Sequence, residues 1–324
     1  MKRLIAHMAM IACLLSLLCG CDAKTTPSRT GFALDTVVTV TLYDQGEANA
    51  ETALTAAFAE IERLESLFSV TCENSDVMCV NTAGGAPVTV SKETAEVLLL
   101  ALDYAKLSDG ALDITIRPVS ALWDFTVDAI PDSAALQQAV TLVDHRNLSV
   151  DGQTVTLSKG GIDLGGIAKG YIADRVAAVL KEQGVRAALI DLGGNIVAVG
   201  DKAGQPFRIG IKDPSEPDSL CAIVDGQDVS VVTSGIYERG FDKDGVRYHH
   251  LLDPVTGMPV QNTLASVTIV CKNSADADAL STACFVMGEE RGVALIESLS
   301  DTEALFVRRD GTMKATDGLT YTTP

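Results

Sequence analysis

The stretch GGIDLGGIAKGYIAD, residues 160–174, joins an expected strand to an expected helix and decides how the middle of the chain folds. Its five glycines permit a tight turn, and a turn that opens a helix exposes backbone amides that can bind anions. The glycine spacing fits neither the dinucleotide fingerprint G-x-G-x-x-G nor a P-loop. On the glycines alone, a plain structural turn is the favoured interpretation. Asp163 and Lys169 add two charged groups to this backbone, which makes the segment a candidate phosphate-binding site.

Hydrophobic periodicity predicts the elements around this stretch. The patterns before it predict a strand at 34–43, helices at 47–68 and 92–107, and a hairpin turning at Asp151-Gly152. The patterns after it predict a helix at 171–183, strands within 186–200, 207–211, 220–224, 228–232 and 265–271, a helix at 275–287, and a last helix and hairpin turning at 310–311. Antiparallel strands with segregated helices make the chain α+β, expected as one compact domain with two lobes.

The first twenty residues are expected to be a secretory signal, because basic residues precede a short apolar run. That run is too short for a permanent membrane span. Its end, Leu18-Cys19-Gly20-Cys21, resembles the bacterial lipobox, whose last cysteine is lipidated; an ordinary signal peptide that happens to contain cysteine is the alternative. Residues 21–30 are then the lipidated cysteine and a polar tether, and residues 31–324 the folded domain.

The charge of the chain excludes nucleic acid as a partner held by the overall field. The formal net charge is −18 at pH 7, and removal of the signal with Lys2 and Arg3 makes it −20. Such a field repels polyanions. Any phosphate must therefore be held locally, by backbone amides, a metal ion or a well-placed lysine.

The cysteines indicate neither a disulfide framework nor a zinc site. Five follow Cys21, which is an odd number, and no CxxC or Cys/His cluster occurs. Cys72 and Cys79 could pair outside the cell. Cys271 and Cys284 lie in apolar runs and are expected in the core.

The segment SADADALSTACF, residues 274–285, places acids at the start of an expected helix. Ser274 is expected to cap this helix, and acids in its first turn are favoured by the helix dipole, which is explanation enough for both aspartates. Asp278 and Thr282, however, are four positions apart and share one helix face. A carboxylate and a hydroxyl are oxygen ligands that suit Mg²⁺. Asp276 is expected to point elsewhere.

Two further segments carry aromatic or titratable side chains. GVRYHHLLDPVTGMP, residues 245–259, contains adjacent histidines, which face opposite sides in a strand. One of His249 and His250 is expected to be exposed and the other to be available to a cleft. SDGALDITIRPVSALWDF, residues 108–125, contains the only tryptophan, Trp123, expected in the core with its N–H hydrogen-bonded.

Together these segments resemble the ApbE family, the bacterial FAD:protein FMN transferases. The matching stretches are DGALDITIRPVSALW, IDLGGIAKGYIAD with LIDLGGNIVAVG, TSGIYERGF with GVRYHHLLDPVTGMP, and ADALSTACFVMG, within residues 34–290. The resemblance implies a T-fold-like α+β lipoprotein, anchored to the cell membrane and facing the periplasm or the cell exterior. It also implies a Mg²⁺-dependent transfer of FMN from FAD to a threonine or serine hydroxyl of an acceptor protein, with release of AMP. The implied acceptors are subunits of Rnf or Na⁺-translocating quinone reductase complexes, or other secreted flavoproteins.

The resemblance also assigns individual residues. The implied metal ligands are Asp278, Thr282 and the backbone carbonyl of Gly166. The implied FAD contacts are Leu34, Ala111, Leu112, Asp113, Asp163, Lys169 and Leu252. His250 matches the family's functional histidine and is expected to relay the proton of the acceptor hydroxyl, while Lys169 neutralises or positions the diphosphate.

Three positions depart from the family pattern. Leu34 replaces a methionine, Thr71 stands where many members have an aromatic residue that stacks on the flavin, and Ser281 replaces a second acid in the metal-binding helix. The second change is expected to weaken flavin stacking and the third to weaken a second or tighter metal site. Two alternative functions remain: an FAD pyrophosphatase, if water replaces the acceptor, or a non-catalytic flavin-binding lipoprotein.

Overall fold

The computed structural model describes residues 26–216 and 218–324. At its centre is an eight-stranded sheet with the order β1-β2-β6-β7-β10-β13-β14-β15. Every neighbouring pair in this sheet is antiparallel. The strands are β1 (Ser28–Ala33), β2 (Thr36–Leu42), β6 (Ala188–Leu192), β7 (Asn195–Val199), β10 (Val229–Gly235), β13 (Leu264–Cys271), β14 (Glu303–Arg308) and β15 (Met313–Ala315).

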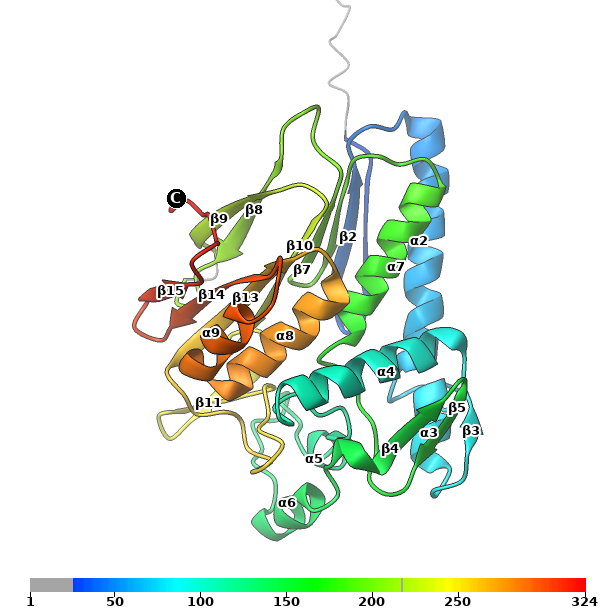
Figure 1. The fold of residues 1–324 in the computed structure, drawn as a ribbon, viewed down its shortest axis with the longest axis vertical. Helices are drawn as coiled ribbons and strands as arrows, with labels where there is room; N and C mark the ends of the chain where they lie inside the picture. The colour runs from blue at the N-terminus through cyan, green and yellow to red at the C-terminus, as the bar shows by residue number, and fades with distance from the viewer. Residues whose placement is uncertain (1–25, 217) are drawn as a thin grey trace, which may run out of the picture.

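Three long helices pack on one face of this sheet (Figure 1). They are α2 (Glu47–Phe68), α7 (Ala168–Glu182) and α8 (Ser274–Met287), and the short α9 (Glu289–Glu297) follows α8. The hairpin of β8 (Phe207–Lys212) and β9 (Leu220–Gly226) covers part of the other face, where Phe207 and Val224 pack against the sheet. A second hairpin, β11 (Gly240–Lys243) with β12 (Val246–His249), leaves the sheet after β10.

The remaining elements form a second lobe below the sheet in Figure 1. They are α3 (Asp76–Thr82), β3 (Val88–Thr89), α4 (Lys92–Leu107), α5 (Arg117–Ser120), α6 (Ser133–Val140), the 3-10 turn His145–Asn147, β4 (Leu148–Asp151) and β5 (Thr154–Leu157). One hydrophobic cluster is continuous between the lobes. It contains Val40 of β2 and Ile172 of α7 together with Leu98 and Val155 of the second lobe. The two lobes therefore share a core.

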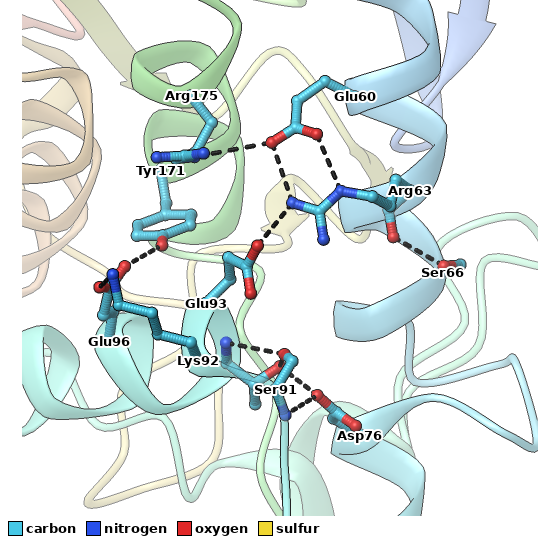
Figure 2. Close-up of polar contacts among 11 residues, drawn as sticks. Glu60, Arg63, Ser66, Asp76, Ser91, Lys92, Glu93, Glu96, Tyr171 and Arg175 are labelled. Carbon is cyan, nitrogen blue, oxygen red and sulfur yellow. Dashed lines mark hydrogen bonds and ion pairs between the residues drawn. The ribbon is translucent and has the colours of Figure 1, made fainter. Parts of the chain in front are cut away.

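A polar network joins the helices of the two lobes, as Figure 2 shows. Arg63 of α2 bonds both Glu60 on its own helix and Glu93 on α4. Tyr171 of α7 donates a hydrogen bond of 2.6 Å to Glu96 on α4. The helix that follows the glycine-rich stretch is thus held to α4 from its first turn.

The α+β fold class and most predicted elements are confirmed. The helices predicted at 47–68 and 92–107 coincide with α2 and α4, and the hairpin at Asp151-Gly152 is β4–β5. The strands and helices predicted after residue 186 correspond to β6 to β10, β13 to β15, α8 and α9, whereas the β11–β12 hairpin was not among them. Among the residues that the structure describes, no helix is long and apolar enough to cross a membrane.

The predicted tether of residues 21–30 is wrong at its end, because β1 already begins at Ser28. The sequence of β1 is polar and therefore resembles a linker. Its hydroxyl groups pair across the strands instead: Ser28 with Thr41 and Thr30 with Thr39, each at 3.0 Å. The expected signal peptide and Cys21 lie outside the described residues.

Candidate active site

The glycine-rich stretch lies against α8 because Gly170 has no side chain. Gly170 was expected to precede the helix, but α7 begins at Ala168 and Gly170 lies within its first turn. A Cβ on Gly170 would lie 2.2 Å from the Ser274 carbonyl oxygen and 2.7 Å from the Asp278 Cβ. The lack of a side chain at Gly170 allows α7 to pack closely against α8, which brings residues 163–170 beside Asp278.

Asp278 replaces one helical hydrogen bond of α7 and thereby frees a carbonyl group. The Gly170 N–H, which would donate to the Gly166 carbonyl in a regular helix, donates to Asp278 Oδ2 at 2.9 Å. Among the described residues no backbone amide donates to the Gly166 carbonyl. Asp278 itself is only 3% exposed. The second carboxylate oxygen and the Gly166 carbonyl oxygen therefore both remain available to a ligand.

Thr282 adds a third oxygen to this set. A Cβ on Gly166 would lie 3.5 Å from Thr282 Oγ1, so the glycine turn and the third turn of α8 are in contact. The Ser234 hydroxyl at the end of β10 lies 3.4 Å from Thr282 Oγ1 and 2.8 Å from Ser281 Oγ. Ser281 is thus a buried hydroxyl that pairs with Ser234.

Several groups near Asp278 act on the pKa of its carboxyl. Burial raises the pKa of the Asp278 carboxyl, while the charge of Lys169, the Gly170 N–H and the Asn195 amide lower it. Asn195 is close enough to act on this pKa, yet neither of its buried polar side-chain atoms has a hydrogen-bond partner. One buried carboxylate, one hydroxyl and one carbonyl are hard oxygen donors, and they fit Mg²⁺. Among residues 26–216 and 218–324, no cluster of three or more His, Cys, Asp or Glu side chains could hold a metal ion.

The start of α8 is capped by another helix, and not by Ser274 as the sequence predicts. Both carboxylate oxygens of Asp174 on α7 accept hydrogen bonds at 2.8 Å, from the Ser274 and Ala275 amides. The Ser274 hydroxyl is buried without a partner. Burial raises the pKa of Asp174 to about 6, against the effect of these two amides. Asp276 turns away and accepts a hydrogen bond from Asn273, as expected.

Asp163 holds the glycine turn in place. Its Oδ1 accepts the Gly165 amide at 3.0 Å, and its Oδ2 accepts the Ser120 hydroxyl at 2.7 Å. Arg117 lies 3.9 Å from the same carboxylate. Lys169 forms no ion pair with any residue in the described part of the chain. Its charge nevertheless lowers the pKa values of Asp278, Glu238 and His250, which places it near all three.

The remaining FAD contacts implied by the resemblance come from three loops. Leu34 occupies the β1–β2 turn with a positive φ of 56°. Leu112 is buried against the glycine turn, where its Cδ1 would lie 3.1 Å from a Cβ on Gly166. Asp113 is buried, and its carboxylate accepts hydrogen bonds from Thr115 and His145. Ala111 precedes Leu112 in this loop. Leu252 packs in a separate cluster with Trp123.

The adjacent histidines do face different environments, but neither is fully exposed. His249 is buried, and its Nε2 lies 3.0 Å from the Val260 carbonyl oxygen. The expectation that one ring is solvated is therefore wrong, because Phe285 packs edge-on against His249. His250 retains 27% of its side-chain surface and has its Nε2 3.8 Å from Glu238 Oε2. Burial and the charges of Lys169 and Arg239 lower the pKa of His250 well below 6.5.

Trp123 is buried and donates from Nε1 to the Gly257 carbonyl at 2.9 Å, as predicted. Cys271 and Cys284 are buried as predicted. Cys72 and Cys79 are exposed free thiols. Thr71 is exposed and pairs with the Ser69 hydroxyl.

The structure thus brings together Gly166, Lys169, Asp278, Thr282 and His250 from segments far apart in the chain. Sequence reasoning missed Asn195 and Glu238, which border this group. Glu238 lies in the stretch TSGIYERGF, whose glycines and polar residues already indicate a loop that lines a site. Nothing local indicates that the Asn195 amide faces Asp278.

Comparisons with known proteins show the family to which the chain belongs. The model of the ApbE family matches residues 34–306. An FAD:protein FMN transferase of Treponema pallidum is 37% identical over 93% of this chain and 90% of its own length. One of Klebsiella pneumoniae is 38% identical over 83% of this chain and 85% of its own length.

Solved structures show the same fold. The ApbE protein of Thermotoga maritima has a TM-score of 0.83 and 33% identity, and the match covers 90% of this chain and 97% of that one. The flavin transferase ApbE of Vibrio cholerae has a TM-score of 0.81 and 30% identity over 90% and 98% of the two chains. From the sequence match across its length and from the shared fold, the chain belongs to the ApbE family.

Proposed function

We propose that this chain is an FAD:protein FMN transferase, which moves FMN from FAD to a hydroxyl of an acceptor flavoprotein and releases AMP. The observation that carries the proposal is the meeting of three oxygen donors beside Lys169, which forms no ion pair with the described residues. The Gly166 carbonyl has lost its helical donor to Asp278, and Thr282 lies against the same turn. The curated relatives of this chain carry the same activity in their names.

The metal would be Mg²⁺, held by the Gly166 carbonyl, the Asp278 carboxylate and the Thr282 hydroxyl. When bound, it supplies charge neutralisation for the diphosphate, which phosphoryl transfer needs more than covalent help. Lys169 adds a positive charge that acts on the Asp278 carboxyl. A chain with a net charge of −18 repels anions, so it needs a local metal ion and a local lysine to hold an anionic dinucleotide.

His250 is the group that accepts the proton of the acceptor hydroxyl. Its lowered pKa keeps the imidazole neutral at pH 7, so the ring has a lone pair available for that proton. Asp163 serves the turn, since Gly165 and Ser120 already occupy its two oxygens. The binding loops around Leu34, Ala111 and Leu252 are proposed to receive the rest of FAD.

The cellular setting is also part of the proposal. Residues 1–20 act as a lipoprotein signal and Cys21 carries the lipid, so the domain is anchored to the membrane on its extracytoplasmic side. The sequence Leu18-Cys19-Gly20-Cys21 supports this. The acceptors are flavoprotein subunits of the Rnf or Na⁺-translocating quinone reductase type, or other secreted flavoproteins.

The test incubates the purified protein with FAD and Mg²⁺, with and without such an acceptor subunit. Flavin fluorescence that stays on the acceptor in a denaturing gel, with stoichiometric AMP, is the expected result. AMP release without an acceptor would instead assign a pyrophosphatase, and no AMP under either condition would assign a flavin binder. Asp278→Ala should abolish turnover, and His250→Ala should slow transfer by about 10²–10⁴-fold. Wild-type rates in these variants would refute the two roles.

A further inference from the structure

Among the described residues, Glu238 is the one carboxylate within ion-pair distance of His250, and the fold holds it there. β11 and β12 pair with Gly240 opposite His249, so the residues just outside the hairpin, Arg239 and His250, lie side by side. The Arg239 carbonyl accepts the His250 amide at 3.2 Å. Glu238 precedes Arg239, and its Oε2 lies 3.8 Å from His250 Nε2.

The hydrogen bonds of His250 fix which ring nitrogen is free. Nδ1 lies 3.4 Å from the Arg239 carbonyl oxygen, and a carbonyl can only accept. A hydrogen bond at this contact requires the tautomer with the hydrogen on Nδ1, which leaves the lone pair of Nε2 toward Glu238. At 3.8 Å the carboxylate is too far for a hydrogen bond to this lone pair, but it can pair with Nε2 once Nε2 is protonated.

The surroundings of Glu238 leave its charge without another partner. Its side chain is 24% exposed, and among the described residues only His250 lies within ion-pair distance of it. The other side of the carboxylate faces the β6–β7 turn, where Oε1 would lie 3.7 Å from a Cβ on Gly194. Burial and Asp278 raise the pKa of Glu238, while Lys169, Arg239 and Lys212 lower it.

We propose that Glu238 is a positioning residue of the transfer reaction, which stabilises the imidazolium form of His250. The inference rests on the proposed transferase function. The acceptor hydroxyl oxygen forms a bond to the FMN phosphorus, and the bond from that phosphorus to the bridging oxygen breaks, its electron pair leaving with AMP. The hydroxyl proton goes to His250 Nε2. Lys169, Arg239 and the neighbouring His249 all disfavour a charged ring. In its ionised form the Glu238 carboxylate, 3.8 Å from Nε2, offsets them.

The test is a double-mutant cycle with Glu238→Gln, His250→Ala and the double variant, measured as FMN transfer to the acceptor at saturating FAD and Mg²⁺. Glu238→Gln should lower kcat on the order of tenfold or more. The KM for FAD and the Kd from flavin fluorescence should stay within about threefold. The double variant should be no slower than His250→Ala alone, because Glu238 acts through the ring.

The matched control is Asp242→Asn, which removes one negative charge from the same hairpin at a side chain that is 73% exposed. It should transfer FMN at the wild-type rate. Glu238→Asp, which keeps the charge on a shorter side chain, should recover part of the rate, and it replaces Glu238→Gln in the cycle if the latter unfolds at a lower temperature.

Three results would overturn the inference: an unchanged kcat in Glu238→Gln, a loss confined to FAD affinity, or losses that multiply in the double variant. Each of these requires a wild-type protein that transfers FMN. A wild-type protein without transfer activity would refute the proposed function itself, so the two failures are distinguishable.

Discussion

Replacing Asp278 by asparagine should separate the stability of the metal-free protein from its response to magnesium. Asparagine keeps the shape and can still accept the Gly170 amide, but it removes a charge from a side chain that is 3% exposed. Burial raises the pKa of this carboxyl. Its ionisation therefore destabilises the fold at pH values above the raised pKa, and does not do so at pH values below the pKa of the same carboxyl in the unfolded chain. At pH 7 without metal, Asp278→Asn should therefore raise the free energy of unfolding.

With magnesium the order should reverse. A ligand at 100 times its dissociation constant adds about 2.7 kcal/mol of stability. For a chain of this size that raises the Tm on the order of 5 °C. The wild type should show this shift in thermal unfolding with Mg²⁺, and Asp278→Asn should show none.

Asp276→Asn is the control for this experiment, since Asp276 lies on the same helix but bonds Asn273 outside the site. It should lose about 0.3–1 kcal/mol from the helix dipole and keep the full response to magnesium. A magnesium shift of wild-type size in Asp278→Asn, or its loss in Asp276→Asn, would refute the ligand assignment.

Three further predictions concern helix packing and pH. Gly170→Ala should destabilise the protein by about 1–3 kcal/mol in denaturant unfolding, because the added Cβ would lie 2.2 Å from the Ser274 carbonyl oxygen. Gly46→Ala is the control, because a Cβ there would have nothing within 4 Å. Equal losses of stability in the two variants would contradict the packing argument. Asp174 has a pKa of about 6 in the fold, above the pKa of an aspartate in the unfolded chain. The wild type should therefore lose about 2–3 kcal/mol of stability relative to Asp174→Asn as the pH rises from 4 to 6. Parallel curves of unfolding free energy against pH for the two proteins would count against this. Because the pKa of Asp278 is raised, protons should compete with Mg²⁺ for its carboxylate. Calorimetry should show that the affinity for Mg²⁺ falls up to tenfold per pH unit in acid. A Mg²⁺ affinity that does not change with pH would rule out Asp278 as the ligand.

Short-range sequence patterns predicted the helices and the hairpin that are specified by residues close together in the chain. The bounds of α2 and α4 followed from apolar residues at helical spacing, and β4–β5 followed from its Asp-Gly turn. β1 was missed because its stability comes from pairing with β2, and its own sequence is polar. Strand pairing of this kind overrides local composition.

The candidate site was predicted mainly through the resemblance, and what the resemblance lacked came from contacts between distant residues. The i, i+4 spacing of Asp278 and Thr282 indicated oxygen ligands without further information. The cap of α8 could not be predicted, because Asp174 lies 100 residues before Ser274. Glu238 was missed for the same reason: its relation to His250 exists only once β11 and β12 pair.

The central claim is that one divalent ion lies between the glycine turn and α8 and contacts the diphosphate of FAD. Crystals grown with FAD and Mn²⁺ in place of Mg²⁺ would test it by anomalous diffraction. The claim predicts a single strong anomalous peak within about 2.0–2.3 Å of the Gly166 carbonyl oxygen, an Asp278 carboxylate oxygen and Thr282 Oγ1, with the diphosphate on its open side. A peak at any other place, or a diphosphate bound away from these three oxygens, would contradict it.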